Sequence, residues 1–151
     1  MIVPVNEQNL DAAAAVHSAA WQESHRAFCT SEFIARHTPA HQRAFLAQKL
    51  AQGARVYLLA EDVAIGVVSV TGSLIEDLYV LPEYQNRGYG TRLLQFAMAR
   101  CSGTPTLWIL ENNAGAERLY RRMGFRPTGR VSRISGTLRE IEFFLPDQKK
   151  R

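Results

Sequence analysis

The sequence predicts an α/β fold in which a central, mostly antiparallel sheet of about six to seven strands is covered by about four helices. Three observations favour it. At 151 residues, the chain has the length of one domain. Apolar residues make up 46% and charged residues 21%, as in ordinary globular proteins. Apolar, β-branched runs alternate with segments of helical periodicity, and no repeat or linker interrupts them. We therefore expect one domain over residues 1–151.

Hydrophobic periodicity predicts the element order β-α-α-β-β-β-α-β-α-β-β. The expected strands cover residues 1–5, 54–61, 63–72, 74–81, 105–110, 125–134 and 138–146. The expected helices follow residue 6, cover 31–52 with a break near 37–41, cover 89–101, and lie around 116–123.

Local signals mark several element boundaries. Pro4 places the first strand at an edge, because proline has no N–H for a central ladder. Asn6 is expected to cap the first helix, and Thr38 followed by Pro39 restarts the second helical region. Gly124 is well placed as the C-terminal cap of the last helix.

The charge balance suits an anionic ligand but does not indicate a nucleic-acid surface. Net charge is +4, and the basic residues are scattered except for a cluster at 148–151. No secretory segment or membrane-length apolar run is present. Cys29 and Cys101 have neither metal-ligand nor redox spacing. We expect a cytoplasmic protein with reduced thiols and with neither nucleic acid nor membrane as a partner.

Two glycines and an arginine lie where an apolar strand gives way to an amphipathic helix, in "YVLPEYQNRGYGTRLLQFAMA", residues 79–99. The start of a helix offers unpaired N–H groups and a positive dipole end. Gly88 and Gly90 would let an anion approach that backbone, and Arg87 adds a charge. A plain glycine turn is the alternative. The segment lacks the lysine of a Walker loop and the third glycine of a dinucleotide fingerprint, which disfavours a Rossmann-type nucleotide-binding domain.

Two segments carry a family resemblance. Residues 85–90, "QNRGYG", match the [QR]-x-x-G-x-[GA] signature of the GNAT superfamily of acyl-CoA N-acetyltransferases. Residues 113–125, "NAGAERLYRRMGF", resemble the family's N-x-x-A-x-x-L-Y-x-x-x-G-F segment. The predicted element order is also similar. The resemblance covers residues 74–125 by motif and most of 1–145 by architecture.

The resemblance implies acetyl-CoA as cosubstrate, with no metal required. Backbone groups of one strand are expected to pair with the pantetheine arm, and the glycine-containing loop is expected to hold the pyrophosphate. The donor-binding residues so implied are Leu78, Tyr79, Val80, Gln85, Asn86, Arg87, Gly88, Tyr89, Gly90, Thr91 and Asn113. Asn113 has an alternative role as a helix N-cap. Arg122 or Arg126 would reach the adenosine phosphates.

Tyr120 is the predicted general acid. Acetyl transfer from a thioester to an amine passes through a tetrahedral intermediate and expels a thiolate, to which a nearby phenol can donate a proton. The alternative is a core tyrosine, because Tyr120 shares an apolar stripe with Ala116, Leu119 and Met123.

Glu76 is the predicted general base, and a base acting through ordered water is an alternative. Strand alternation sends Glu76 and Asp77 to opposite faces, with Glu76 on the face of Leu74 and Leu78. Such apolar surroundings would raise the pKa of the Glu76 carboxyl. Polyamine-type members of the family carry a similar Glu-Asp pair that faces the acceptor.

The acceptor pocket is expected from the first two helices and the loop between them. Trp21, His25, Phe28 and Asp77 are its candidate residues, and His25 is also a second candidate base. Trp21 and Phe28 have core roles as alternatives. His37 and His41 have the spacing of a zinc pair, but no H-E-x-x-H glutamate lies between them.

The predicted function is direct acetyl transfer from acetyl-CoA to a primary amine, and the paired carboxylates favour an amine on a small molecule. A protein or peptide N-acetyltransferase and a non-catalytic acyl-CoA sensor on the same fold are the alternatives. The sequence does not name the amine. Exposed strands in the C-terminal hairpin would support a homodimer.

Overall fold

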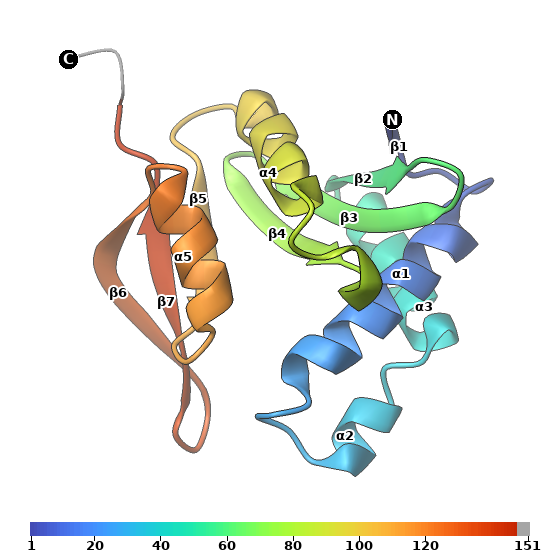
Figure 1. The fold of residues 1–151 in the computed structure, drawn as a ribbon, viewed down its shortest axis with the longest axis horizontal. Helices are drawn as coiled ribbons and strands as arrows, with labels where there is room; N and C mark the ends of the chain where they lie inside the picture. The colour runs from blue at the N-terminus through green and yellow to red at the C-terminus, as the bar shows by residue number, and fades with distance from the viewer. Residues whose placement is uncertain (148–151) are drawn as a thin grey trace.

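One seven-stranded sheet runs through the protein and separates two layers of helices (Figure 1). The structure is a computed structural model that describes residues 1–147, so the basic cluster at 148–151 lies outside it. The elements in chain order are β1 (Ile2–Pro4), α1 (Leu10–His25), α2 (Ser31–Ala35), α3 (Pro39–Ala51), β2 (Arg55–Ala60), β3 (Ala64–Thr71), β4 (Leu74–Val80), a 3₁₀ turn (Pro82–Tyr84), α4 (Tyr89–Arg100), β5 (Thr106–Leu110), α5 (Ala114–Arg122), β6 (Arg126–Ser135) and β7 (Leu138–Phe144).

The predicted fold class is confirmed, and most predicted boundaries match the observed ones. Thr38 caps α3 by accepting the His41 N–H, and Pro39 is its first residue, so the second helical region forms two helices, α2 and α3. The predicted cap role of Asn6 is wrong. Its side chain accepts the Gln8 N–H in a turn, and α1 begins after Asn9.

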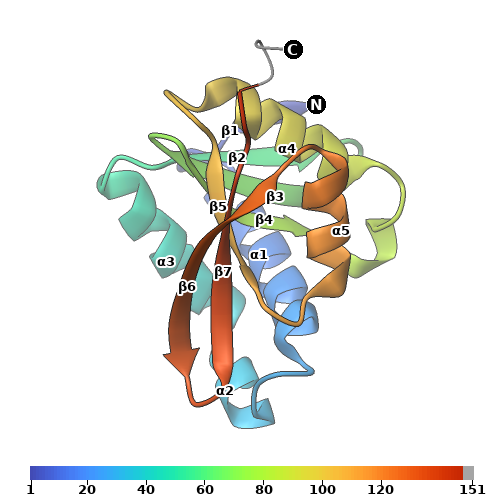
Figure 2. The ribbon, with the colours of Figure 1, turned by 90° about the vertical axis from the view of Figure 1, so that its left-hand side faces the viewer.

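Helices cover both faces of the sheet because its central strands are apolar on both. Along β2, Val56 and Leu58 pack with α1 and α3, whereas Tyr57 and Leu59 pack in the cluster that contains the apolar residues of α4 and α5. Figure 2 shows α3 and α5 on opposite sides of the strands. This alternation fixes which face of each strand meets which helix layer. Within residues 1–147, no helix combines the length and hydropathy that crossing a bilayer requires.

The sheet divides between β4 and β5. The strand order is β1-β2-β3-β4-β5-β7-β6, and every neighbouring pair is antiparallel except β4 and β5. These two parallel strands pair at Leu74 and Thr106, the first residue of each. Beyond that point they diverge (Figure 1). The backbone edge of β4 that faces β5 is therefore free of a neighbouring strand along most of its length.

β6 forms one free edge of the sheet. All ten of its residues are exposed, including the apolar side chains of Val131 and Ile134. An exposed edge strand offers unpaired backbone groups to a second chain. The homodimer expected at this hairpin stays a prediction.

Gly66 lets β3 lie unusually close to β4 and α4, and a substitution at this position tests that close packing. A Cβ atom at this position would lie 2.9 Å from the Tyr79 carbonyl oxygen and 2.8 Å from Leu93 Cδ1. Overpacking of this kind costs about 2 kcal/mol. Gly66→Ala is therefore expected to lower the free energy of unfolding by about that amount, measured by urea denaturation. Gly115→Ala in α5 is the matched control, because its Cβ would meet no atom closer than 3.9 Å. An equal loss in both variants would contradict the packing explanation.

Candidate active site

The space between the diverging strands β4 and β5 is a cavity of about 750 Å³. Residues 75–79 of β4 and 107–110 of β5 form its two main walls. The end of α1, the loop after it, Phe33 of α2, Asn113 and α5, the end of β6 and the start of β7 complete the lining. The predicted site residues that line it are Trp21, His25, Phe28, Glu76, Asp77, Leu78, Tyr79, Asn113 and Tyr120. The structure thus brings the predicted catalytic and acceptor residues together around one cavity.

The remaining predicted donor residues follow β4 in the chain. Val80 ends the strand, and residues 85–91 form the loop and first turn of α4. The Gln85 side-chain amide donates a hydrogen bond to the Val80 carbonyl oxygen at 3.0 Å. This bond fixes the loop to the end of the strand.

The loop has the backbone shape that an anion-binding turn requires. Asn86 and Gly88 adopt φ angles of 63° and 88°, in the left-handed region. A Cβ at Gly88 would meet no atom within 4 Å, so the backbone there borders open space. The first helical hydrogen bond of α4 runs from the Arg92 N–H to the Gly88 carbonyl, which leaves the N–H groups of residues 89–91 without helical partners. These residues fit a diphosphate such as that of coenzyme A.

Tyr120 and Asn113 both come from α5. The Asn113 side chain accepts the Ala116 N–H at 3.1 Å, so its alternative role as an N-cap is present. Tyr120 is buried in the core cluster next to Phe125, and it also lines the cavity. Burial raises the pKa of the Tyr120 phenol. The phenol therefore stays protonated at neutral pH and can donate a hydrogen bond into the cavity.

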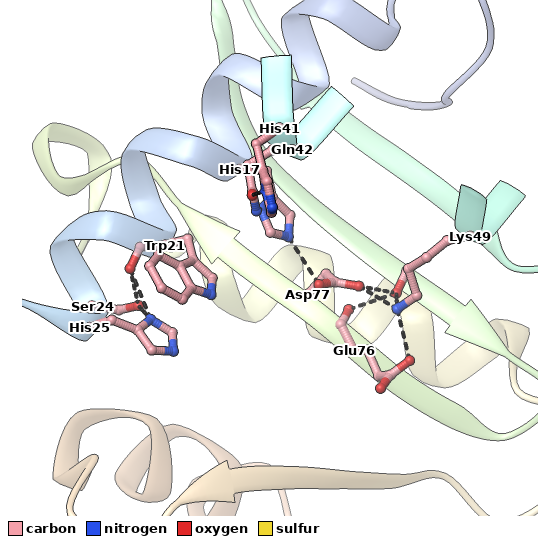
Figure 3. A network of polar contacts seen from close by, with 10 residues as sticks. His17, Trp21, Ser24, His25, His41, Gln42, Lys49, Glu76 and Asp77 are labelled. Carbon is pink, nitrogen blue, oxygen red and sulfur yellow. Dashed lines mark hydrogen bonds and ion pairs between the residues drawn. The ribbon is translucent and has the colours of Figure 1, made fainter. Parts of the chain in front are cut away.

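The predicted placement of Glu76 and Asp77 on opposite faces is wrong. Both carboxylates contact the same ammonium group, that of Lys49 on α3 (Figure 3). The reason is a bulge in β4: Val67 pairs with Tyr79 but Ser69 pairs with Glu76, so β4 has one more residue than β3 over this stretch. Asp77 takes a left-handed φ of 55° within the bulge, which breaks the strand alternation.

Lys49 also changes the environment predicted for Glu76. Its Nζ donates to Glu76 Oε1 at 2.8 Å and to Asp77 Oδ2 at 2.6 Å. The Glu76 side chain is 42% exposed and the Asp77 side chain 11%. Glu76 is therefore a partly exposed member of an ion pair, and its predicted apolar surroundings are not observed.

A chain of hydrogen bonds fixes Asp77 from its other side. His17 Nε2 donates to Asp77 Oδ1 at 3.0 Å, and His17 Nδ1 accepts from the Gln42 amide at 2.7 Å. The Gln42 carbonyl oxygen in turn accepts from His41 Nδ1 at 2.6 Å. Ser69 donates to Asp77 Oδ2 at 2.9 Å. The chain links α1, α3, β3 and β4 through one carboxylate.

These contacts shift the pKa values of the buried pair in opposite directions. Burial alone would raise the pKa of Asp77, but the hydrogen bond from His17 and the charge of Lys49 outweigh it and lower this pKa to about 2. Burial alone would lower the pKa of Lys49, but its charge interaction and hydrogen bonds with Asp77, together with those with Glu76, raise it. Both groups are therefore charged across the neutral range.

An aromatic stack lies farther along α1, at the rim of the cavity. The Trp21 ring is stacked between His25, with centroids 3.9 Å apart, and His37, at 3.5 Å. His25 Nδ1 lies 2.9 Å from the Trp21 carbonyl oxygen, and burial lowers the pKa of His25. Among residues 1–147, no three His, Cys, Asp or Glu side chains gather in a way that could hold a metal ion.

Sequence reasoning missed Lys49, His17 and Gln42 as members of the site. Gln42 and Lys49 share a helix face with the buried Leu46, at spacings of four and three residues. Polar residues on a buried helix face are a signal of a buried polar network, and His17 on the apolar face of α1 is the same signal. Glu140 on β7 was also missed, and it lines the cavity.

Comparisons with known proteins agree with this architecture. The family described as acetyltransferase (GNAT) domain matches residues 41–127. The peptidyl-lysine N-acetyltransferase YjaB of Salmonella typhimurium is 31% identical over 70 residues, which are 46% of this chain and 48% of that protein. The chain thus matches about half the length of this curated relative.

Two solved structures share the fold at low sequence identity. Apo-form YjaB from Escherichia coli has a TM-score of 0.74 and 19% identity, covering 95% of each chain. The PaiA N-acetyltransferase from Thermoplasma acidophilum, solved in complex with coenzyme A, has a TM-score of 0.70 and 17% identity, covering 94% of this chain and 96% of that one.

Removing the charge of Asp77 from its pair with Lys49 is expected to lower stability in a pH-dependent way. Asp77→Asn leaves Lys49 without one partner, and breaking a buried pair costs about 3 kcal/mol. The folded-state pKa of Asp77 is depressed from 3.8 to about 2, so its contribution is complete above pH 4 and is lost as the pH falls toward 2. Asp77→Asn is expected to lower the unfolding free energy at pH 7 and to flatten its fall between pH 4 and 2, measured by urea denaturation.

The control for this prediction is Asp11→Asn. Asp11 pairs with Arg43 at 2.5 Å, but its side chain is 83% exposed. An exposed pair contributes less than about 1 kcal/mol. Asparagine also tolerates a left-handed φ, so the Asp77 variant reports on charge rather than on backbone strain. Equal stability of the Asp77 variant and the unmodified protein at pH 7 would show that the network is energetically neutral.

Proposed function

Because the chain belongs to the GNAT acetyltransferase family, we propose that it transfers the acetyl group of acetyl-CoA directly to a primary amine. One observation carries the proposal. The loop that fits a diphosphate begins where β4 ends, and the preceding residues of β4 line a cavity that also contains Tyr120. A single strand therefore joins the anion-binding loop to the groups suited to acyl transfer.

The donor would bind along β4 and the loop after it. The N–H groups of residues 89–91 and the charge of Arg87 would hold the pyrophosphate, and the free edge of residues 78–80 would pair with the pantetheine arm. Acetyl-CoA supplies an activated thioester when bound. The protein contributes proximity, and a backbone N–H near Val80 would polarise the thioester carbonyl. No step of this route needs a metal.

Tyr120 would act as the general acid. Its protonated phenol would donate to the sulfur as the thiolate leaves. Glu76 lines the same cavity, where its partly exposed carboxylate would attract an acceptor ammonium group. The aromatic stack around Trp21 would border the same pocket on its apolar side.

The acceptor we propose is a small molecule carrying a primary alkylamine. Carboxylates and aromatic rings on the cavity wall suit an alkylammonium group. A lysine side chain has the same chemistry, and the activity named for the Salmonella relative supports a peptidyl-lysine acceptor as the second candidate. The two candidates differ in the group that carries the amine, which is a small molecule in the first and a polypeptide in the second.

An acceptor screen tests the proposed function. Thiol release from acetyl-CoA is measured with spermidine, with a peptide containing one internal lysine, and with a peptide that has a free N-terminal alanine. Coenzyme A binding is followed separately by calorimetry. We expect binding together with amine-dependent release, fastest with spermidine. Binding without release for any amine would favour a non-catalytic acyl-CoA sensor, and faster release with the lysine peptide would favour the protein acceptor.

The role of Tyr120 has its own test. Tyr120→Phe is expected to lower kcat by about 100-fold or more, because general acid catalysis contributes 10²–10⁴-fold, while acetyl-CoA affinity changes little. Tyr57→Phe is the matched control: it removes a buried phenol from the same core cluster, and Tyr57 is outside the cavity lining. Unchanged kcat in the Tyr120 variant would remove this residue from the mechanism.

A further inference from the structure

Three carboxylates line the cavity, and only one of them has no cationic partner among the described residues. Lys49 pairs with Glu76 and Asp77. Glu140 forms no ion pair or side-chain hydrogen bond with any residue in the range 1–147, although it is half-buried. The carboxylate that is free to exchange a proton with a bound ligand is therefore Glu140.

Glu140 lies where two hollows meet. On β7 it pairs with Leu110 of β5 and Ser132 of β6. It lines the main cavity and also a second, open hollow of about 630 Å³ bordered by β6. Glu76 and Trp108 line both spaces as well. Glu140, Glu76 and Trp108 thus form the part of the wall that the two hollows share.

The charged and titratable groups around Glu140 come from several neighbouring elements, but not from β5, whose residues in the cavity wall are not titratable. Glu76 and Tyr79 of β4 interact electrostatically with it. Two arginines of β6, Arg130 and Arg133, line the second hollow, and Arg130 is paired with Glu142. The other titratable groups on the cavity wall are His25, Cys29, Asp77 and Tyr120.

These surroundings favour the protonated form of Glu140. Burial raises the pKa of its carboxyl, and the nearby charge of Glu76 raises it further. A carboxylate with a raised pKa is a stronger base near neutral pH than an ordinary glutamate. Glu76 differs, since taking up a proton would disrupt its ion pair with Lys49.

We propose that Glu140 is the general base, accepting a proton from the acceptor ammonium at the junction of the two hollows. The inference rests on the proposed acetyltransferase function. One ammonium proton passes to the Glu140 carboxylate, and the neutral amine forms a C–N bond to the thioester carbonyl carbon. The C–S bond breaks, Tyr120 protonates the departing sulfur, and the second nitrogen proton returns to the Tyr120 oxygen directly or through solvent. Glu140 then releases its proton to water, which balances the reaction.

The experiment compares the pH dependence of kcat/KM in variants of Glu140, Glu76 and Glu7, using the amine that gives the fastest release in the acceptor screen. The protein is expected to show a rising limb as Glu140 loses its proton, above the pH range of an ordinary glutamate. Glu140→Gln is expected to abolish that limb and to lower kcat/KM by about 100-fold at pH 7.5. Glu76→Gln is expected to keep the limb and to change mainly KM. Glu7→Gln makes the same charge change at an exposed residue outside the cavity lining and is expected to match the unmodified protein.

The outcomes separate this inference from the proposed function. A rising limb that persists in Glu140→Gln overturns the assignment while the acetyltransferase function stands. Loss of the limb in Glu76→Gln instead returns the role to Glu76. No amine-dependent release by the unmodified protein refutes the function itself. Coenzyme A affinity and circular dichroism establish that Glu140→Gln is folded, and partial activity with a retained limb in Glu140→Asp would support the role of the carboxylate.

Discussion

The geometry of the site depends on the ion pairs that the Lys49 ammonium group forms with Glu76 and Asp77. The ammonium group bridges two consecutive carboxylates of β4, and the bulge at Asp77 is what brings both within its reach. Two such carboxylates side by side would repel each other without a cation between them. Because Lys49 belongs to α3 and Asp77 is also bound by His17 of α1, the same contact joins the N-terminal helices to the strand that forms one cavity wall.

The acidic residues of the cavity differ in whether they pair with Lys49. A carboxylate that neutralises a buried cation is committed to its charged form and contributes to structure. Asp77 is in this state, with its oxygens occupied by Lys49, His17 and Ser69. Among the described residues, Glu140 has no such cation, and burial together with the nearby charge of Glu76 raises the pKa of its carboxyl. Lys49 thus pairs with two of the three carboxylates that line the cavity, and Glu140 has no cationic partner among residues 1–147.

Local patterns in the sequence predicted the element order and the glycine-containing loop before α4, whereas most residues placed around the cavity were implied by the family resemblance. They did so because strand alternation, helix caps and the glycine-containing motif are encoded by neighbouring residues. The faces of Glu76 and Asp77 were mispredicted, because the bulge is supported by contacts from Lys49, 27 and 28 residues away in the chain. The position of Glu140 depends on how β5, β6 and β7 assemble, and no local signal distinguishes it from Glu142, the other acid of β7.

The short pairing between β4 and β5 also affects the width of the cavity. A continuous ladder of hydrogen bonds makes a sheet stiff across each strand pair, but these two strands pair at Leu74 and Thr106, beside which the Thr106 N–H donates to the Ser73 carbonyl. Ile75 and Leu107 pack in the core cluster just inside that junction. The two halves of the sheet thus meet at an angle that depends on the volume of the side chains packed beside the paired residues. Core packing at this point therefore sets the width of the cavity between β4 and β5.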